Sequence, residues 1–349
     1  MKALKLVLLG GLLSGMWCER VGGIEVSSFC QAQVPGEYVL EAEEGTWTWG
    51  MAPIYDEAGK LHIFNSIIPR SGSWIKNSRI AHWVADRPEG PYTFLGNVFA
   101  SDDASYHNPQ ISKVGDTYVL VFLLNRHRDE NGSKQEVGIA TAKSPDGPWT
   151  ESPLNPIIPA AGVLNGYQIV HASNPTFVVT PEGTFRIYYK TMTDALPIKK
   201  GFREIAFAES DTIEGPYVNY AHNPVISYAD KQLDIEDPYA FYYNGMYYMI
   251  VEDRQGVKNM LEGNPIPAGQ LKKGGYRPGL IYQSKDGIDW GEPKVGYLTN
   301  EMYFGHKLAR SERPSILWKD GKPECLFLAC HDEKPSAGYF VRINNWNGE

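Results

Sequence analysis

The sequence predicts an all-β protein, a five-bladed β-propeller, because two short patterns recur along it at intervals of a few tens of residues. The first pattern is a residue followed by proline at the start of an apolar strand, and its prolines lie 56, 66, 63 and 76 residues apart. Each of them precedes a strand, a tight turn and a second strand, which is typical of a β-hairpin. The five dipeptides are Ala52-Pro53, Asn108-Pro109, Asn174-Pro175, Asp237-Pro238 and Arg313-Pro314.

The second pattern closes each repeating unit and has the composition of an outer strand with its turn. It occupies residues 85–93, 142–150, 208–218 and 284–293. Five openings and four closings, with the last unit cut short near the C-terminus, indicate five blades. A propeller ring must be sealed, and we expect the segment from roughly 30 to 50 to supply the missing strand of the fifth blade.

The N-terminus has the composition of an export signal. Residues 1–18 begin with Lys2 and Lys5 and continue as an apolar stretch with small residues, so we expect a signal peptide there. The stretch is shorter than the roughly 20 residues that span a membrane, and no other segment approaches that length. We therefore predict an exported protein, periplasmic, secreted or at the cell surface, with Cys18 as a candidate lipid anchor. An N-terminal segment would follow at 19–44 and the propeller domain at 45–349.

Charge and cysteine content narrow the function classes. A net charge of −8 and a pI near 5.6 argue against a nucleic-acid partner, because such proteins carry basic patches. Export would permit disulfides, and Cys30 could pair with Cys325 or Cys330; three buried thiols are the equal alternative. Cys325 and Cys330 are five residues apart in one strand and should face opposite ways.

The residues beside each repeated proline should meet at one end of the central channel, because the innermost strand of every blade lines it. They are Met51-Ala52, His107-Asn108, Ser173-Asn174, Glu236-Asp237 and Glu312-Arg313. Glycoside hydrolysis needs a carboxylic acid and a second carboxylate, while arginine and asparagine hold hydroxyls or a uronate. The predicted catalytic residues are Asp237, Glu312, His107 and Glu236, and the predicted sugar contacts are Asn108, Asn174, His171, Arg313, Asp253, Arg254 and His306.

Several of these residues have a second interpretation. Glu236 and Asp237 are adjacent on a strand and should face opposite ways, so only Asp237 is expected in the site. Asp253 and Arg254 could form an ordinary ion pair, and His171 could be a core histidine. The aromatic residues expected mostly in the core, with one stacking on a sugar, are Trp47, Trp49, Tyr106, Tyr167 and Tyr239.

The five-fold pattern, with IEDPYAF at 235–241 and SERPSILWKDGKPECLF at 311–327, resembles the five-bladed propellers of glycoside hydrolase families 43, 32 and 117 over about residues 45–345. The resemblance implies an exo-acting enzyme with a base on blade one, a carboxylate that positions it or tunes a pKa, and an acid. In family 117 a histidine is associated with the acid role, which makes His107, His171 and His306 candidates.

One departure concerns the base, since family 43 carries an aspartate before the blade-one proline and this chain has Ala52. Asp56 and Glu57 fall in the following hairpin turn, so Asp102, Asp103 or Asp253 would have to serve, or the chemistry differs. We expect a secreted exo-acting hydrolase that removes a terminal sugar from plant or algal polysaccharide fragments. The alternatives are a non-catalytic carbohydrate-binding propeller and a polysaccharide lyase. No cofactor or metal ligand is predicted, although a divalent cation could occupy the channel.

Overall fold

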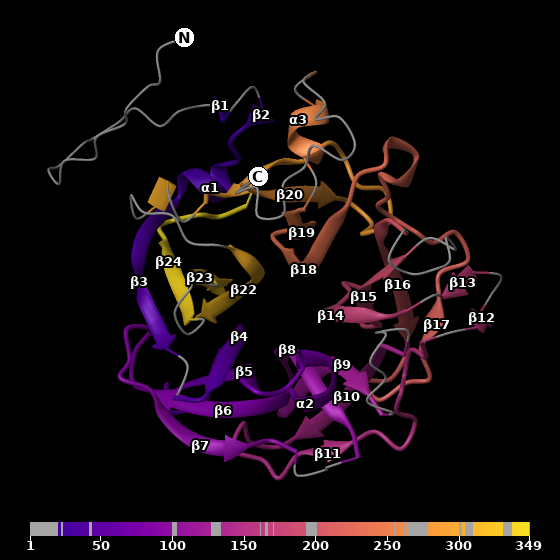
Figure 1. Cartoon of the computed structure of the whole chain (residues 1–349). Helices are drawn as coiled ribbons and strands as arrows, with labels where there is room; N and C mark the ends of the chain where they lie inside the picture. The colour runs from indigo at the N-terminus through magenta and orange to yellow at the C-terminus, as the bar shows by residue number, and fades with distance from the viewer. Residues whose placement is uncertain are drawn as a thin grey trace, which may run out of the picture.

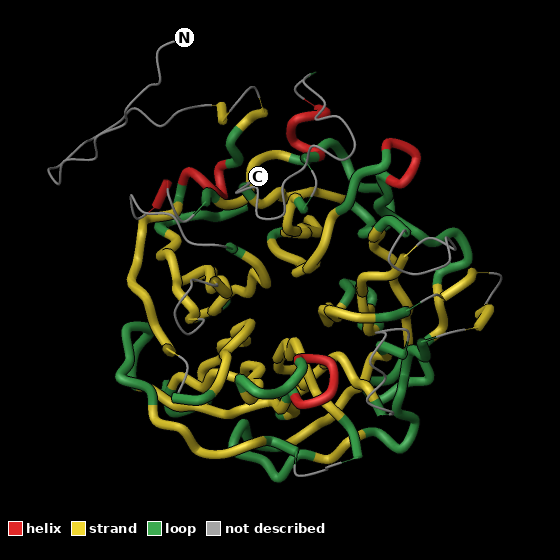
Figure 2. The backbone as a smooth tube through the Cα atoms, viewed as in Figure 1, coloured by secondary structure: helices red, strands yellow, loops and turns green. Residues whose placement is uncertain are grey.

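Five four-stranded antiparallel sheets stand in a ring around a central axis (Figure 1), which confirms the predicted five-bladed β-propeller. The computed structural model describes residues 20–21, 24–41, 44–99, 103–126, 134–160, 162–164, 167–169, 171–192, 201–254, 256–261, 263, 278–299, 302–303, 310–330 and 337–348. Strands build the ring and the helices are short (Figure 2). The predicted signal peptide at 1–18, with Cys18, lies outside the described residues.

Each blade runs from an innermost to an outermost strand. Blade one consists of β4 (Thr46–Tyr55), β5 (Leu61–Pro69), β6 (Arg79–Ala85) and β7 (Thr93–Asn97). Blade two consists of β8 (Ser105–Val114), β9 (Thr117–Asn125), β10 (Glu136–Ala142) and β11 (Thr150–Glu151). Blade three consists of β14 (Ser173–Val179), β15 (Phe185–Met192), β16 (Arg203–Ser210) and β17 (Val218–Asn219). Blade four consists of β18 (Ile235–Tyr243), β19 (Met246–Asp253), β20 (Gly279–Ser284) and β21 (Lys294–Tyr297). Blade five is β22 (Glu312–Lys319), β23 (Lys322–Cys330), β24 (Ala337–Ile343) and β3 (Gln33–Glu41).

The N-terminal strand β3 closes the ring by pairing with β24, from Gln33 beside Ile343 to Glu41 beside Ala337. The segment predicted at 30–50 therefore divides: residues 33–41 complete blade five, and residues 46–55 are the innermost strand of blade one. The propeller accordingly includes residues that were predicted to form a separate segment at 19–44.

Short elements decorate the ring. They are β1 (Arg20–Val21), β2 (Ile24–Glu25), α1 (Ser28–Gln31), α2 (Trp74–Asn77), β12 (Gly162–Leu164), β13 (Tyr167–Ile169), the 3-10 helix η2 (Ala229–Lys231) and α3 (Val257–Leu261). The Ser27 side chain caps α1 by accepting a hydrogen bond from the Cys30 N–H, and its hydroxyl donates to the Val295 carbonyl on blade four. Among the described residues, no helix has both the length and the apolar character needed to cross a membrane.

The innermost strand of every blade contains a β-bulge whose first residue is left-handed. The φ angles are +62° at Gly50, +50° at Asn108, +52° at Asn174, +57° at Asp237 and +56° at Arg313. Asparagine, aspartate and glycine tolerate this conformation better than other residues do. In blades two to five the next residue is proline, which lacks the N–H that a bulged position leaves out of the ladder. The repeated dipeptide is therefore the signature of this bulge.

Five apolar clusters lie at the five seams between neighbouring blades, and a smaller sixth cluster packs Ile24, Val26 and Cys30 against Val295 of blade four. At the seam between blades two and three, for example, Val119 and Ile139 pack against Phe177 and Ile187. Cys30, Cys325 and Cys330 are buried and unbonded, so the thiol interpretation holds and the disulfide alternative is wrong. Burial raises the pKa of the Cys30 thiol to about 12, which keeps it protonated.

The turn that follows the third strand of a blade contacts the preceding blade, and we call it the seam turn. The seam turn of blade one places Glu89 against Arg342 of blade five. In blade three, Glu214 accepts a hydrogen bond from the Thr141 hydroxyl of blade two at 3.2 Å. In blade four, the Asp286 carbonyl accepts from Arg186 of blade three at 2.8 Å. Polar contacts at these turns thus supplement the apolar seams.

Candidate active site

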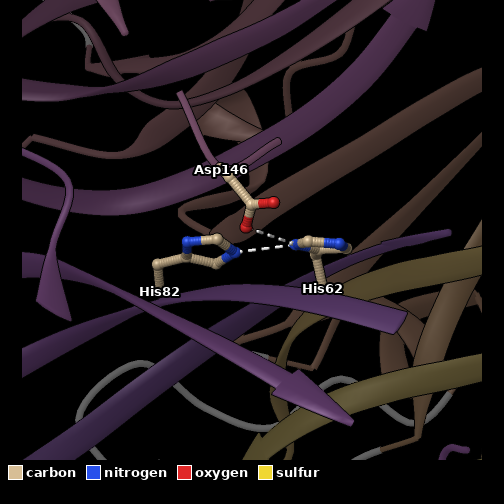
Figure 3. A group of neighbouring side chains, drawn as sticks. All are labelled: His62, His82 and Asp146. Atoms are coloured by element: carbon tan, nitrogen blue, oxygen red, sulfur yellow. Dashed lines mark hydrogen bonds and ion pairs between the residues drawn. The ribbon is translucent and has the colours of Figure 1, made fainter. Parts of the chain in front are cut away.

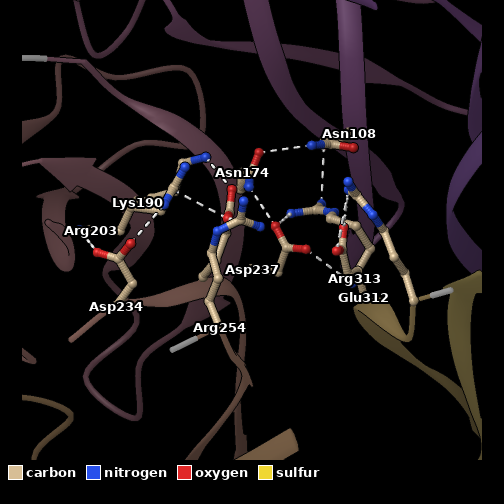
Figure 4. Close-up of polar contacts among 11 residues, drawn as sticks. Asn108, Asn174, Lys190, Arg203, Asp234, Asp237, Arg254, Glu312 and Arg313 are labelled. Atoms are coloured by element: carbon tan, nitrogen blue, oxygen red, sulfur yellow. Dashed lines mark hydrogen bonds and ion pairs between the residues drawn. The ribbon is translucent and has the colours of Figure 1, made fainter. Parts of the chain in front are cut away.

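The bulge residues of blades two to five are joined by polar contacts in one network, which we call the polar ring (Figure 4). The Asn108 amide donates to the Asn174 side-chain carbonyl at 2.8 Å, and the Asn174 amide donates to the Asp237 carboxylate. The Arg313 backbone N–H donates to the other Asp237 oxygen at 3.1 Å, and the Arg313 guanidinium donates to the Asn108 carbonyl at 3.3 Å. Four blades are therefore joined by side chains at one level of the channel.

Blade one contributes Gly50 to this ring rather than Ala52. The bulge lies between Trp49 and Ala52, and Ala52 is buried in the core between blades one and two. A Cβ atom on Gly50 would stand 3.7 Å from the Arg313 side chain. The prediction that Ala52 occupies the blade-one site position is wrong by two residues, because the left-handed residue and not the proline defines the register. The expectation that blade one supplies no carboxylate at this position is still correct, because the residue there is Gly50.

Three carboxyl groups gather beside the ring. Asp237, Glu252 and Glu312 each offer an oxygen within 4.8 Å of the other two. Glu252 lies on β19 opposite Glu236 on β18, and Glu312 begins β22. Like charges at this separation cannot all be ionised, so the group retains protons near neutral pH.

Glu312 has the environment of a proton donor. Burial, followed by the negative charge of Asp237, raises its pKa to about 7, although Arg310 lies 3.4 Å away. Burial and the neighbouring Glu312 also raise the pKa of Glu252 well above its usual range. One Glu252 oxygen is buried and has no hydrogen-bond partner among the described residues.

Glu236 is held ionised. Lys190 lies 2.6 Å from its carboxylate, Arg254 at 3.1 Å and Arg203 at 3.2 Å. Burial alone would raise the pKa of Glu236, but the attraction of these three cations lowers it well below its usual range. Arg203 also pairs with Asp234 at 2.8 Å. The site therefore contains one carboxylate that is ionised and one carboxylic acid that titrates near neutral pH.

Both members of the Glu236-Asp237 pair belong to this network, although only Asp237 was expected in the site. The left-handed conformation of Asp237 interrupts the strand alternation that would have separated them. Asp237 faces Asn174 and Arg313, whereas Glu236 faces the three cations.

The two described histidines that were predicted for the site, His107 and His171, are neutral at pH 7. His107 is buried, its Nδ1 lies 2.8 Å from the Ser78 hydroxyl, and burial lowers its pKa to about 3. His171 is also buried, and burial with the charge of Lys190 lowers its pKa to about 3. Neither His171 nitrogen has a hydrogen-bond partner in the described part of the chain. His306 lies outside the described residues.

The structure does not bring Asp253 to the carboxyl cluster. Its oxygens accept the backbone N–H groups of Gly256, Val257 and Lys258 at 2.7 to 3.0 Å, at the start of α3. Arg254, in contrast, faces Glu236 as described. Asp253 therefore binds the backbone at the start of α3, whereas Arg254 pairs with Glu236.

The other candidate bases also lie away from the cluster. Asp56 and Glu57 occupy the hairpin turn of blade one, where Glu57 pairs with Lys113 at 2.8 Å. Asp103 is exposed, and Asp102 lies outside the described residues.

Aromatic residues flank both ends of the channel. Trp49 is half-buried one residue before Gly50, at the strand position that Glu312 holds in blade five, and the Arg310 guanidinium lies 5.9 Å from its ring. At the opposite end a cavity of about 490 Å³ is lined by Tyr55, Phe177, Tyr239, Tyr243 and Trp318, among others. Tyr239 thus lies away from the carboxyl cluster, Tyr106 is buried, and Trp47 packs against Arg70. The Tyr167 side chain is outside the description.

Oxygen donors of the kind that hard cations take are present in Asp237, Glu252 and Glu312. The cluster offers three carboxyl groups, so a bound cation would need water or other ligands to complete its shell. The divalent cation expected in the channel stays a prediction.

Sequence reasoning missed four members of the network: Glu252, Lys190, Arg203 and Asp234. Lys190 is a buried cation within the apolar strand β15, and such a residue in a strand pattern signals a partner in the interior. Glu252 follows the apolar run of β19, but its pairing with Glu236 is visible only from the register.

No family model matches the sequence, and no curated protein matches it. Solved structures with the same architecture include a family 117 glycoside hydrolase from the marine bacterium Zobellia galactanivorans, at TM-score 0.61 and 16% identity over 89% of both chains. A Bombyx mori family 32 β-fructofuranosidase gives TM-score 0.61 and 15% identity over 87% of this chain and 61% of that one. CoXyl43, a family 43 β-xylosidase/α-arabinofuranosidase from a compost metagenome in complex with xylotriose, gives 0.55 and 13% over 88% and 94%. The chain therefore shares its five-bladed β-propeller fold with glycoside hydrolases of families 117, 32 and 43.

Proposed function

We propose that the protein is a glycoside hydrolase in which Glu312 protonates the leaving oxygen of the scissile bond. The observation that carries this proposal is the buried Glu312 carboxyl, which lies within 4.8 Å of the Asp237 and Glu252 carboxyls and whose pKa of about 7 leaves roughly half of it protonated at neutral pH. A general acid works best when its pKa lies near the operating pH. Environments that push the pKa values of neighbouring carboxyls apart are how glycosidases separate an acid from an anion.

The roles of the neighbouring groups follow from their contacts. Both Asp237 oxygens are engaged, one by Asn174 and the other by the Arg313 N–H, so we assign Asp237 to positioning and to raising the Glu312 pKa. Glu236 is ionised, but its charge is neutralised by three cations, so we assign it to holding Lys190, Arg203 and Arg254 in place. The water that adds to the anomeric carbon passes its proton to the Glu312 carboxylate left by the first step, which restores the acid.

We further propose that the substrate is the end of an oligosaccharide. Arg313, Asn108, Asn174 and Asp237 link across one end of the channel, which favours a blind site that admits a chain terminus over a passage through the ring. Trp49 offers a half-buried aromatic face for stacking against that sugar. The xylotriose complex of the family 43 neighbour supports a short oligosaccharide as the kind of ligand. The apolar N-terminus supports export, with plant or algal polysaccharide fragments as the substrates.

A second candidate function, carbohydrate binding without turnover, is favoured by Gly50. The blade-one ring position lacks a carboxylate, and Arg313 packs against it. A protein without a base to activate water would hold a sugar end and release it unchanged.

The decisive experiment incubates the purified protein with plant and algal oligosaccharides and follows monosaccharide release beside Glu312→Gln and Asp237→Asn. Release by the parent protein that Glu312→Gln lowers by about 10²- to 10⁴-fold, the usual contribution of a general acid, would support hydrolysis. Binding to the same oligosaccharides with no release would refute hydrolysis and support the binding function. An unsaturated uronate product would refute both and indicate a lyase.

A further inference from the structure

Two histidines and an aspartate meet at the seam between blades one and two, apart from the carboxyl cluster (Figure 3). His62 lies on β5, His82 on β6, and Asp146 on the seam turn of blade two. His62 Nδ1 lies 2.8 Å from His82 Nε2 and 3.7 Å from an Asp146 carboxylate oxygen. The three donor atoms all lie within 4.8 Å of one another.

The two rings are positioned by packing. Both imidazoles are buried, and His82 stacks on Phe64 with ring centroids 4.5 Å apart. A neutral imidazole has one nitrogen lone pair available for a metal ion.

Asp56 stands behind His62. Its carboxylate lies 3.5 Å from His62 Nε2, the nitrogen that faces away from His82. Histidines that ligate metals commonly donate their second N–H to a carboxylate, which fixes the tautomer and orients the ring. The other Asp56 oxygen accepts the Lys60 backbone N–H at 2.7 Å, so the hairpin turn holds this carboxylate in place.

Asp146 differs from the acidic residues in the other seam turns. Glu89 faces the cation Arg342, and Glu214 faces the hydroxyl of Thr141. Asp146 instead faces an imidazole pair that has another carboxylate, Asp56, behind it. Two carboxylates and two imidazole rings form a donor set whose negative charge a divalent cation would balance.

We propose that His62 Nδ1, His82 Nε2 and the Asp146 carboxylate bind a Zn²⁺ ion that links blades one and two. Two imidazole nitrogens and a carboxylate oxygen are ligands that Zn²⁺ takes at about 2.0–2.2 Å in tetrahedral sites. That geometry separates neighbouring nitrogens by about 3.3 Å, so the rings must part by roughly half an ångström from their hydrogen-bonded distance of 2.8 Å. The Asp146 side chain is 60% exposed, so the fourth position opens to water and the ion has an entry path.

The test measures zinc in the full chain after dialysis against metal-free buffer and titration with ZnCl₂. We expect one Zn²⁺ per chain by calorimetry, a visible absorption spectrum with Co²⁺ in its place, and an unfolding temperature that rises with zinc concentration. Ca²⁺ and Mg²⁺, which prefer oxygen ligands, should neither compete nor stabilise through this site. His82→Gln should abolish the Co²⁺ spectrum, and Asp146→Asn should weaken zinc binding at least tenfold.

Matched variants separate a metal site from ordinary seam packing. Asp56→Asn keeps an oxygen for Lys60 but loses the charge behind His62, so zinc affinity should fall by about 10- to 100-fold. Glu89→Gln alters the equivalent turn of blade one, and His222→Ala removes an exposed histidine elsewhere; both should bind zinc as the parent does. Unchanged zinc affinity in Asp146→Asn, or absence of zinc binding by the parent, would overturn the proposal. Because Asp146 is exposed on a turn, its variant tests the site even if His82→Gln fails to fold.

Discussion

Replacing Glu312 by glutamine should make the protein more stable in alkaline solution while removing its proton donor. The Glu312 pKa is about 7 in the folded protein and near 4.5 in an unfolded chain. A carboxyl whose pKa is raised by folding contributes fully to stability below its unfolded pKa, and this contribution is lost as the pH rises through the folded value. Ionised Glu312 therefore destabilises the native state above pH 7.

The magnitude follows from the two pKa values. Each pKa unit is worth about 1.36 kcal/mol, so the full difference is on the order of 3 kcal/mol, of which about 2–3 kcal/mol develops between pH 5 and pH 8. Glutamine has nearly the same shape and no charge to desolvate. We expect the Glu312→Gln variant to match the parent near pH 5 and to exceed its unfolding free energy by about 2–3 kcal/mol at pH 8.

The assay is chemical denaturation at both pH values, with Glu57→Gln as the control. Glu57 is exposed in the hairpin turn of blade one, where a surface substitution should change the unfolding free energy by less than about 0.5 kcal/mol at either pH. If Glu312→Gln is less stable than the parent at pH 8, or if its stability relative to the parent does not depend on pH, the assignment of a proton to Glu312 is refuted. Hydrolysis by the parent should decline above pH 7 for the same reason.

Three further substitutions probe the ring and its surroundings. Glu236→Gln leaves the buried Lys190 without its anion and takes one anion from Arg203 and Arg254, so it should lower the unfolding free energy by about 3–5 kcal/mol at pH 7; a loss below 1 kcal/mol would contradict this. Gly50→Ala adds a side chain at φ +62° and should cost about 1–2 kcal/mol in a denaturation experiment, so a neutral outcome would contradict a left-handed residue there. Trp49→Ala should weaken oligosaccharide binding by about 0.5–1.5 kcal/mol, roughly 2- to 13-fold, in calorimetry on the inactive Glu312→Gln background. The control Trp47→Ala should bind as tightly as its background, and equal affinities in all three proteins would exclude Trp49 as a stacking platform.

The blade count was predictable because one local conformation recurs. A left-handed residue followed by proline is a strong sequence signal, and it marks four of the five bulges at Asn108, Asn174, Asp237 and Arg313. Blade one was predicted, but its bulge was placed at Ala52 instead of Gly50, because this bulge uses glycine followed by methionine and a proline stands three residues further along at Pro53. The physical requirement is tolerance of positive φ, and Gly50 meets it without proline.

The carboxyl cluster was only partly predictable. Glu312 and Asp237 lie next to the repeated prolines, so their convergence follows from the ring geometry alone. Glu252 lies on a second strand, and its approach depends on the register that pairs it with Glu236. The protonation states depend on distances between blades, such as that from Lys190 to Glu236, which one sequence does not contain. Asp253 was predicted to contact the sugar, but its oxygens accept backbone N–H groups at the start of α3.

The pairing of β3 with β24 has a consequence for biosynthesis. The two strands can pair along their full length only after Ala337, the partner of Glu41, has left the ribosome, so the ring closes long after β3 has been synthesised. During that interval β3 lacks its partner, and β22, the inner strand of blade five, has only part of its sheet. Unpaired strand edges recruit other strands, so nascent chains of this protein are most exposed to aggregation late in translation. A stop codon anywhere before residue 337 would leave that hazard permanent.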